Sequence, residues 1–292
     1  MIVRLHDPLR RPIFQPTAAR LPYTPEGMNR KGAAFALLAV TISVAIAALI
    51  APRTPQPLSY HHFADQRAVL GIPNFGDVVS NLAFAVFGVW GLWFLLRLTP
   101  DELNTRFVDP RERWFYAVIF LGLVLTAAGS SYYHLAPNNA RLVWDRLPMT
   151  VVFMSLVAAL IAERISVRAG LGLWPILLAI GILSVLQWHW SEQSGQGDLR
   201  FYAAVQVYAI LVLLLVLFMP SRYTRTSDLG VVLALYVLAK LLETFDRPVF
   251  SARNIVSGHT LKHITAGLAG YWILRMLQER HGLGIRYIGV AR

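Results

Sequence analysis

The sequence contains no cysteine, and this absence removes several kinds of chemistry. Without thiols the chain has no disulfide, no thiolate ligand for a metal and no cysteine nucleophile. Any metal site must therefore be built from histidine and carboxylate side chains.

Charged residues are also scarce. They make up 15% of the 292 residues, whereas hydrophobic residues make up 56%, and the mean hydropathy is +0.51. This composition is typical of a membrane protein. The formal net charge of +11 could suggest a nucleic-acid partner, but the basic residues fall mainly between apolar runs, where membrane topology explains them. We therefore predict the lipid bilayer as the partner, and no nucleic acid.

Eight long apolar runs predict an all-α integral membrane protein. The first run follows about thirty polar, proline-rich residues, which is not the pattern of a signal peptide. No internal repeat is evident, which argues against an inverted-repeat transporter. The predicted spans are 33–51, 77–98, 114–134, 147–163, 170–188, 201–219, 229–245 and 258–277.

The distribution of lysine and arginine predicts the orientation of these spans. The side that holds both termini carries 18 of these residues and the opposite side carries 7. Because positive loops stay in the cytoplasm, both termini are predicted to be cytoplasmic. Residues 1–31 and 279–292 then form cytoplasmic tails of a multi-pass protein, which we expect in a bacterial inner membrane.

A polar stretch at 129–149 interrupts the apolar pattern between the third and fourth spans. Ser130 and His134 are four positions apart, so on a helix they share one face. Asp145 follows across a short turn, just before Pro148, which we expect to begin the next helix. Polar groups at a membrane boundary are costly unless they are paired or bind something.

A second histidine pair lies far downstream, at the start of the last apolar run. His259 and His263 are also four positions apart. The predicted topology places His134 and His259 at the same depth, near the outer leaflet. Three histidine ligands and one open position are what a catalytic zinc site needs.

Zinc at such a site would bind water and lower the pKa of that water to roughly 7. Asp145 could accept the proton of this water, and Ser130 could donate a hydrogen bond to a carbonyl oxygen that becomes negative. Each residue alone also has an ordinary structural interpretation. Asp145 could belong to a helix N-cap, Ser130 could bond its own helix, and one histidine could be an interfacial residue. A haem held between two histidines would leave the third unexplained.

Several motifs together resemble those of the alkaline ceramidases. They are Gly-Ser-x3-His at 129–134, Asp-x-Leu-Pro-Met at 145–149, Gly-His-x3-His at 258–263, and Phe-Gly-Asp-Val-Val-Ser-Asn-Leu at 75–82. The resemblance implies zinc at His134, His259 and His263, with Ser130 and Asp145 as catalytic residues. It also implies hydrolysis of a ceramide-like membrane lipid to a long-chain base and a fatty acid. The resemblance further implies a seven-helix core over residues 60–278, preceded by one extra transmembrane helix at 32–52.

The wider group that shares this pattern includes the seven-helix progestin and adipoQ receptors. The alternative function is therefore a lipid-binding, receptor-like membrane protein in which zinc is structural. Visible absorption separates either of these from a haem protein. The sequence predicts no oligomeric state.

Some positions depart from the alkaline ceramidase pattern. The family's calcium site uses a cluster of acidic residues before the first core helix, and only Asp65, Asn74 and Asp77 stand there, which argues against calcium. Lys262 lies between the paired histidines, where the family has aromatic residues. It is expected to snorkel to lipid head groups, or to meet an anionic one. Asp246 matches a family aspartate and could orient a histidine ligand or form a surface ion pair.

Aromatic residues at the end of the fifth span predict an interfacial belt. Trp188 and Trp190 flank His189 there. Tryptophan is enriched where a helix leaves the hydrocarbon, so no further role is needed to explain them.

Overall fold

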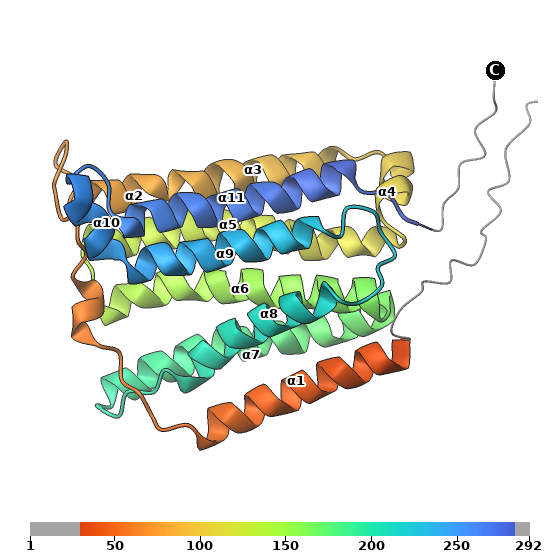
Figure 1. Cartoon of the computed structure of the whole chain (residues 1–292), viewed down its shortest axis with the longest axis horizontal. Helices are drawn as coiled ribbons and strands as arrows, with labels where there is room; N and C mark the ends of the chain where they lie inside the picture. The colour runs from red at the N-terminus through yellow and green to blue at the C-terminus, as the bar shows by residue number, and fades with distance from the viewer. Residues whose placement is uncertain (1–29, 284–292) are drawn as a thin grey trace, which may run out of the picture.

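A computed structural model of the chain describes residues 30–283, which are helical almost throughout. The helices lie side by side and run along one common direction (Figure 1). Beyond two isolated bridges, no strand occurs in this part of the chain. The predicted tail at 1–31 lies almost wholly outside the described residues, as does most of the tail at 279–292.

The described residues form eleven α-helices and two short 3-10 helices. The long helices coincide closely with the predicted apolar runs, whereas the short helices α4 and α10 were not predicted. The α-helices are α1 Arg30–Ile50, α2 Phe75–Ser80, α3 Leu82–Arg97, α4 Pro100–Arg106, α5 Arg113–Leu135, α6 Asn139–Arg164, α7 Val167–Gln193, α8 Arg200–Val216, α9 Asp228–Thr244, α10 Asp246–Arg253 and α11 Gly258–Glu279.

Five helical segments are long and apolar enough to cross a membrane, as a helical membrane protein requires. They are Lys31–Ile50, Phe75–Arg97, Pro110–Leu135, Asn139–Arg164 and Val167–Gln193. Helix α8 is apolar but has 17 residues, so it is shorter than these five.

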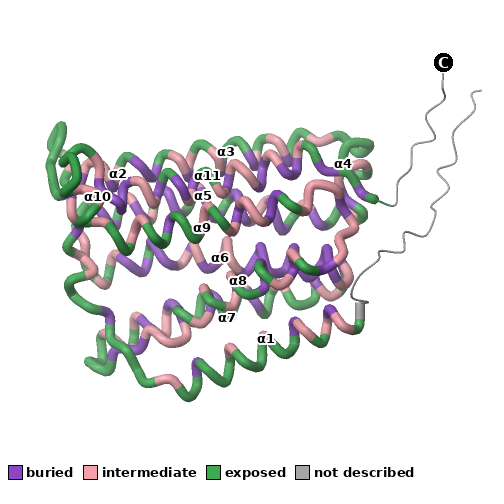
Figure 2. Tube along the Cα trace, viewed as in Figure 1, coloured by how far each residue is buried: buried purple, intermediate pink, exposed green. Residues whose placement is uncertain are grey.

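Helix α6 is the most buried of the five and lies inside the bundle, whereas α1 is the least buried and lies at its edge (Figure 2). Helix α1 packs against α8, where the hydroxyls of Thr41 and Tyr208 lie 3.0 Å apart. Its outer face exposes Phe35, Ile46 and Ile50. An apolar face of this kind suits contact with lipid rather than with water.

The start of α6 corrects the prediction for this region. The helix begins at Asn139 rather than near 147, and the side chain of Asn138 caps it by accepting from the Arg141 amide at 2.9 Å. Pro148 therefore lies inside α6, and Asp145 is not an N-cap residue. Proline has no N–H to donate to the Trp144 carbonyl one turn earlier. That carbonyl lies against Gly129 of α5, where the two helices approach closely.

Gly129 should tolerate no side chain, because α5 and α6 approach each other there. A β-carbon at Gly129 would lie 2.0 Å from the Trp144 carbonyl oxygen, which is backbone and cannot rotate away. We expect Gly129→Ala to destabilise the protein by about 1–3 kcal/mol and to lower its melting temperature in detergent. The matched control is Gly230→Ala in α9, where no atom lies within 4 Å of the added carbon. Equal melting temperatures for the two variants would contradict this account of the packing.

Candidate metal centre

Three histidines from two helices meet at one end of the bundle. His134 lies in the last turn of α5, and His259 and His263 lie in the first two turns of α11. The side chain of Ser257 caps α11 by accepting from the Thr260 amide at 3.0 Å. This cap fixes where α11 begins, and the four-residue spacing then turns both histidines toward α5.

The three imidazoles form one compact, buried cluster. Their ring centroids are 4.8–5.0 Å apart, and one nitrogen from each ring lies within 4.8 Å of the others. At most 4% of any of the three residues is exposed. Phe63 covers the cluster, with its ring centroid 4.5 Å from that of His134 and 4.6 Å from that of His259. The structure thus brings together the three predicted ligands.

Hydrogen bonding leaves nitrogen atoms of this cluster available to a metal. His263 Nδ1 lies 3.1 Å from the Asp77 carbonyl oxygen and 2.9 Å from Ser80 Oγ. Because a carbonyl only accepts, Nδ1 carries the proton and Nε2 keeps its lone pair for a ligand. Neither ring nitrogen of His134 has a hydrogen-bond partner among the described residues. Buried polar atoms without partners are costly, and a bound cation would satisfy one of these two nitrogens.

The donor set fits a divalent metal ion and is compatible with zinc. Three neutral imidazoles are the protein ligands of one class of catalytic zinc sites. A porphyrin between any two of the rings would meet the third, about 5 Å away, so the geometry favours a single ion over haem.

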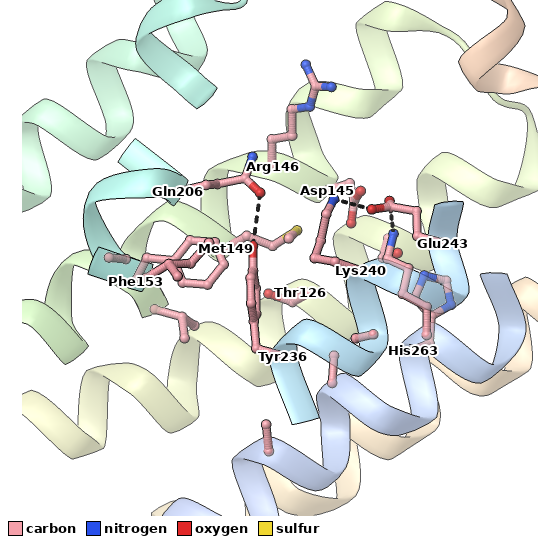
Figure 3. Close-up of a pocket in the computed structure, with 18 of the residues that line it drawn as sticks. Thr126, Asp145, Arg146, Met149, Phe153, Gln206, Tyr236, Lys240, Glu243 and His263 are labelled. Atoms are coloured by element: carbon pink, nitrogen blue, oxygen red, sulfur yellow. Dashed lines mark hydrogen bonds and ion pairs between the residues drawn. The ribbon is translucent and has the colours of Figure 1, made fainter. Parts of the chain in front are cut away.

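Asp145 and His263 line one cavity (Figure 3). Ser130 lines the same cavity. Ser130 lies one turn before His134 on α5, and Asp145 lies on α6. The Ser130 hydroxyl is buried close to the Asp145 carboxylate. The predicted serine and aspartate therefore lie at the same end of the bundle as the histidines.

The cavity extends from this polar end into the apolar interior and has a volume of about 390 Å³. Its walls come from α5, α6, α8, α9 and α11. Gln206 of α8 and Tyr236 of α9 meet across one side, where the tyrosine hydroxyl donates to the amide oxygen at 3.3 Å (Figure 3). The far end is lined by apolar side chains, which are Ile119, Leu156, Leu213, Val232 and Ile273. A cavity with one polar end and one long apolar end suits a lipid chain.

Lys262 does not snorkel outward, which was the first of the two roles that the sequence suggested for it. It points into the cavity, where its Nζ contacts Glu243 Oε1 at 2.8 Å and lies 3.4 Å from His259 Nε2. Glu243 also forms an ion pair with Lys240 (Figure 3). The three charged side chains thus form a network beside the histidine cluster.

The polar residues just before α2 and in its first turn have partners within the protein. Both oxygens of Asp65 accept from Arg67, which holds the pKa of that carboxyl below its ordinary value. Asn74 donates its amide to the His134 carbonyl at 2.8 Å. Asp77 Oδ1 accepts from the Ser257 and Thr260 hydroxyls. These contacts tie the loop to the ends of α5 and α11.

Asp246 also has a role in positioning, although not the one predicted. Its Oδ1 accepts from the backbone amide of His259 at 2.8 Å, and its Oδ2 accepts from that of Ala64 at 2.8 Å. It therefore holds the first turn of α11 and the covering loop, rather than a histidine ring or a surface arginine.

Sequence reasoning missed a buried cation at the same end of the cavity. Arg146 of α6 has its guanidinium carbon 4.1 Å from the ring centroid of Trp188, 4.4 Å from that of Tyr202 and 5.7 Å from that of Tyr60. Its Nη2 donates to Gln56 Oε1 at 2.6 Å. Trp188 is thus fully buried against Arg146 instead of lying in an interfacial belt, whereas Trp190 is exposed as predicted. The available signal was the position of Arg146, directly after Asp145 and between the predicted spans 114–134 and 147–163.

Neither a protein-family model nor a curated protein sequence matches this chain. The function is therefore inferred from the chain's own residues and from the resemblance of their motifs.

Proposed function

We propose that the protein is an integral-membrane, zinc-dependent amide hydrolase that cleaves ceramide-like lipids to a long-chain base and a fatty acid. The observation that carries the proposal is the shared location of three features. A buried three-histidine cluster, a carboxylate and a hydroxyl lie at the polar end of a cavity whose other end is apolar. The resemblance of the motifs to those of alkaline ceramidases supports the same reaction.

His134, His259 and His263 would hold the zinc. The ion would supply Lewis acidity, which polarises a carbonyl and lowers the pKa of water at the site to roughly 7. The reaction also needs a site that excludes bulk water and positions the lipid. The apolar walls of the cavity would exclude water and hold an acyl chain with its amide at the polar end.

Asp145 and Ser130 have the chemistry for the remaining roles. The Asp145 carboxylate lines the cavity beside the Ser130 hydroxyl, where it can take a proton from water and pass it to the leaving amine. The buried Ser130 hydroxyl can donate to the amide oxygen as negative charge develops there.

The proposal includes the arrangement in the membrane. Helices α1, α2 with α3, α5, α6, α7, α8, α9 and α11 would form eight spans, of which the last seven make the core. The excess of lysine and arginine on one side supports cytoplasmic termini in a bacterial inner membrane. The candidate metal centre would then lie toward the outer leaflet.

Fatty acid release tests the proposed reaction. Purified wild-type protein is incubated with a mixture of ceramides and other lipid amides, and free fatty acid is quantified by mass spectrometry. We expect release over many turnovers, loss of release after treatment with a chelator, and recovery with added zinc. Bound lipid amide without release would instead assign the receptor-like function with a structural metal.

A further inference from the structure

The polar end of the cavity carries more positive than negative side chains. Among the described residues that line it, Arg146, Lys240 and Lys262 are cationic, whereas Asp145 and Glu243 are anionic. The lining therefore has one positive charge in excess, and a divalent metal at the histidines would add to it. Uncompensated charge within a membrane bundle is costly and usually marks a functional site.

Lys262 is the cation best placed to meet a ligand. Its side chain is 14% exposed, and its nearest carboxylate is Glu243. Glu243 is already shared, because Lys240 pairs with it and the Tyr60 hydroxyl donates to it at 3.3 Å. Glu243 therefore does not neutralise both lysines, and it would keep Lys240 and Tyr60 as partners if Lys262 turned to a ligand.

Arg146 has a spare donor in a different environment. Three aromatic rings surround its guanidinium, and Nη2 is used by Gln56. Its Nη1 is buried and has no hydrogen-bond partner in the part of the chain that the structure describes. A buried guanidinium without a carboxylate partner is unusual, because such charges are normally paired.

We propose that this polar end is a subsite for an anionic group on the lipid, with Lys262 and Arg146 supplying the positive charge. The assignment rests on the proposed function, since it names the class of lipid amide. The substrate would be an N-acyl amphiphile whose amine-derived half bears a carboxylate, sulfonate or phosphate. A neutral ceramide head group would leave the excess charge uncompensated.

Two matched amides test the charge preference. N-dodecanoylglycine and N-dodecanoylethanolamine share the acyl chain and the amide and differ in carrying a carboxylate or a hydroxyl. We expect wild-type kcat/KM to favour the glycine amide by about tenfold or more, as a charge-assisted hydrogen bond would provide. Equal kcat/KM values for the two amides would overturn the subsite.

Substitutions at lysine then locate the preference. Lys262→Met is expected to bring the ratio of the two kcat/KM values close to one, whereas Lys262→Arg should retain most of it. Lys31→Met is the control, because it removes the same charge from an exposed position near the start of α1, away from the cavity. A wild-type ratio in Lys262→Met would contradict the role of this residue.

The role of Arg146 is tested in the same assay with the variant Arg146→Met, once its melting temperature shows that the variant is folded. Arg146→Met is expected to lower the ratio as well. An unchanged ratio in folded Arg146→Met would remove this residue from the subsite.

A binding measurement separates failure of the subsite from failure of the proposed hydrolysis. The rise in melting temperature is compared for the two amides and for dodecanoate, in wild-type protein and in Lys262→Met. A larger, Lys262-dependent rise with the glycine amide supports the subsite even if no fatty acid is released. Equal rises with both amides overturn the subsite even if both are hydrolysed. An equal Lys262-dependent rise with dodecanoate would assign the anion to a free fatty acid and overturn the head-group assignment.

Discussion

Replacing His134 or His263 with alanine is expected to remove the metal. Wild-type protein purified without chelators should contain about one zinc per chain, and each variant less than about a tenth of that. The physical reason is that each ring supplies one of only three protein nitrogens to the ion. Loss of an outer hydrogen bond to a metal ligand already weakens metal binding by about 10–100-fold, so loss of a ligand should cost more. Elemental analysis by mass spectrometry gives the metal content.

His62→Ala is the matched control for this experiment. His62 lies in the loop that follows the first span, and it is exposed. The variant should keep the wild-type zinc content, because no nitrogen of His62 belongs to the cluster. Zinc that stays at the wild-type level in both His134→Ala and His263→Ala would show that the ion is bound elsewhere.

The sequence was most informative where one helix determined the geometry. The four-residue spacings of Ser130 with His134, and of His259 with His263, predicted shared helix faces, and the helices formed as expected. The apolar runs also predicted the long helices. A run of about 20 apolar residues is long enough to cross a bilayer as a helix, and this can be read directly from the sequence. The convergence of α5 and α11 required a further assumption, which was the eight-span topology that puts the end of α5 and the start of α11 on one side of the membrane.

The start of α6 could not be decided from proline alone. Pro148 is compatible with the first turn of a helix, where its missing N–H matters least. Asn138 offers a competing start ten residues earlier, as an N-cap residue whose side chain accepts from the Arg141 amide. Residue preferences therefore allow a start at either position, and the folded protein uses the one at Asn138.

Charged residues in apolar segments were the hardest to interpret. A lysine such as Lys262 has a long apolar stem that can reach the interface or turn inward, and the sequence does not distinguish these directions. Its partner Glu243 lies 19 positions earlier on another helix, so the ion pair appears only in the folded bundle. The aromatic surroundings of Arg146 likewise come from separate segments, which no local pattern connects.

Asp145→Asn is expected to abolish most turnover while leaving the metal in place. Asparagine has nearly the same shape, but its amide cannot take a proton from water. We expect kcat for lipid amide hydrolysis to fall by about 10²–10⁴-fold, the usual contribution of a general acid–base group. The zinc content should stay near one per chain, because Asp145 is not among the clustered ligands.

The same two measurements on Asp101→Asn control for the loss of a carboxylate. Asp101 is exposed in the first turn of α4, at the end of the bundle away from the histidines (Figure 1). This variant should match the wild type in both zinc content and kcat. If Asp145→Asn hydrolyses lipid amides at the wild-type rate, Asp145 is not the proton acceptor, and another group must carry that step. If it loses both zinc and turnover, its carboxylate helps to hold the metal. Only retained zinc with lost turnover separates the transfer of a proton from the binding of the ion.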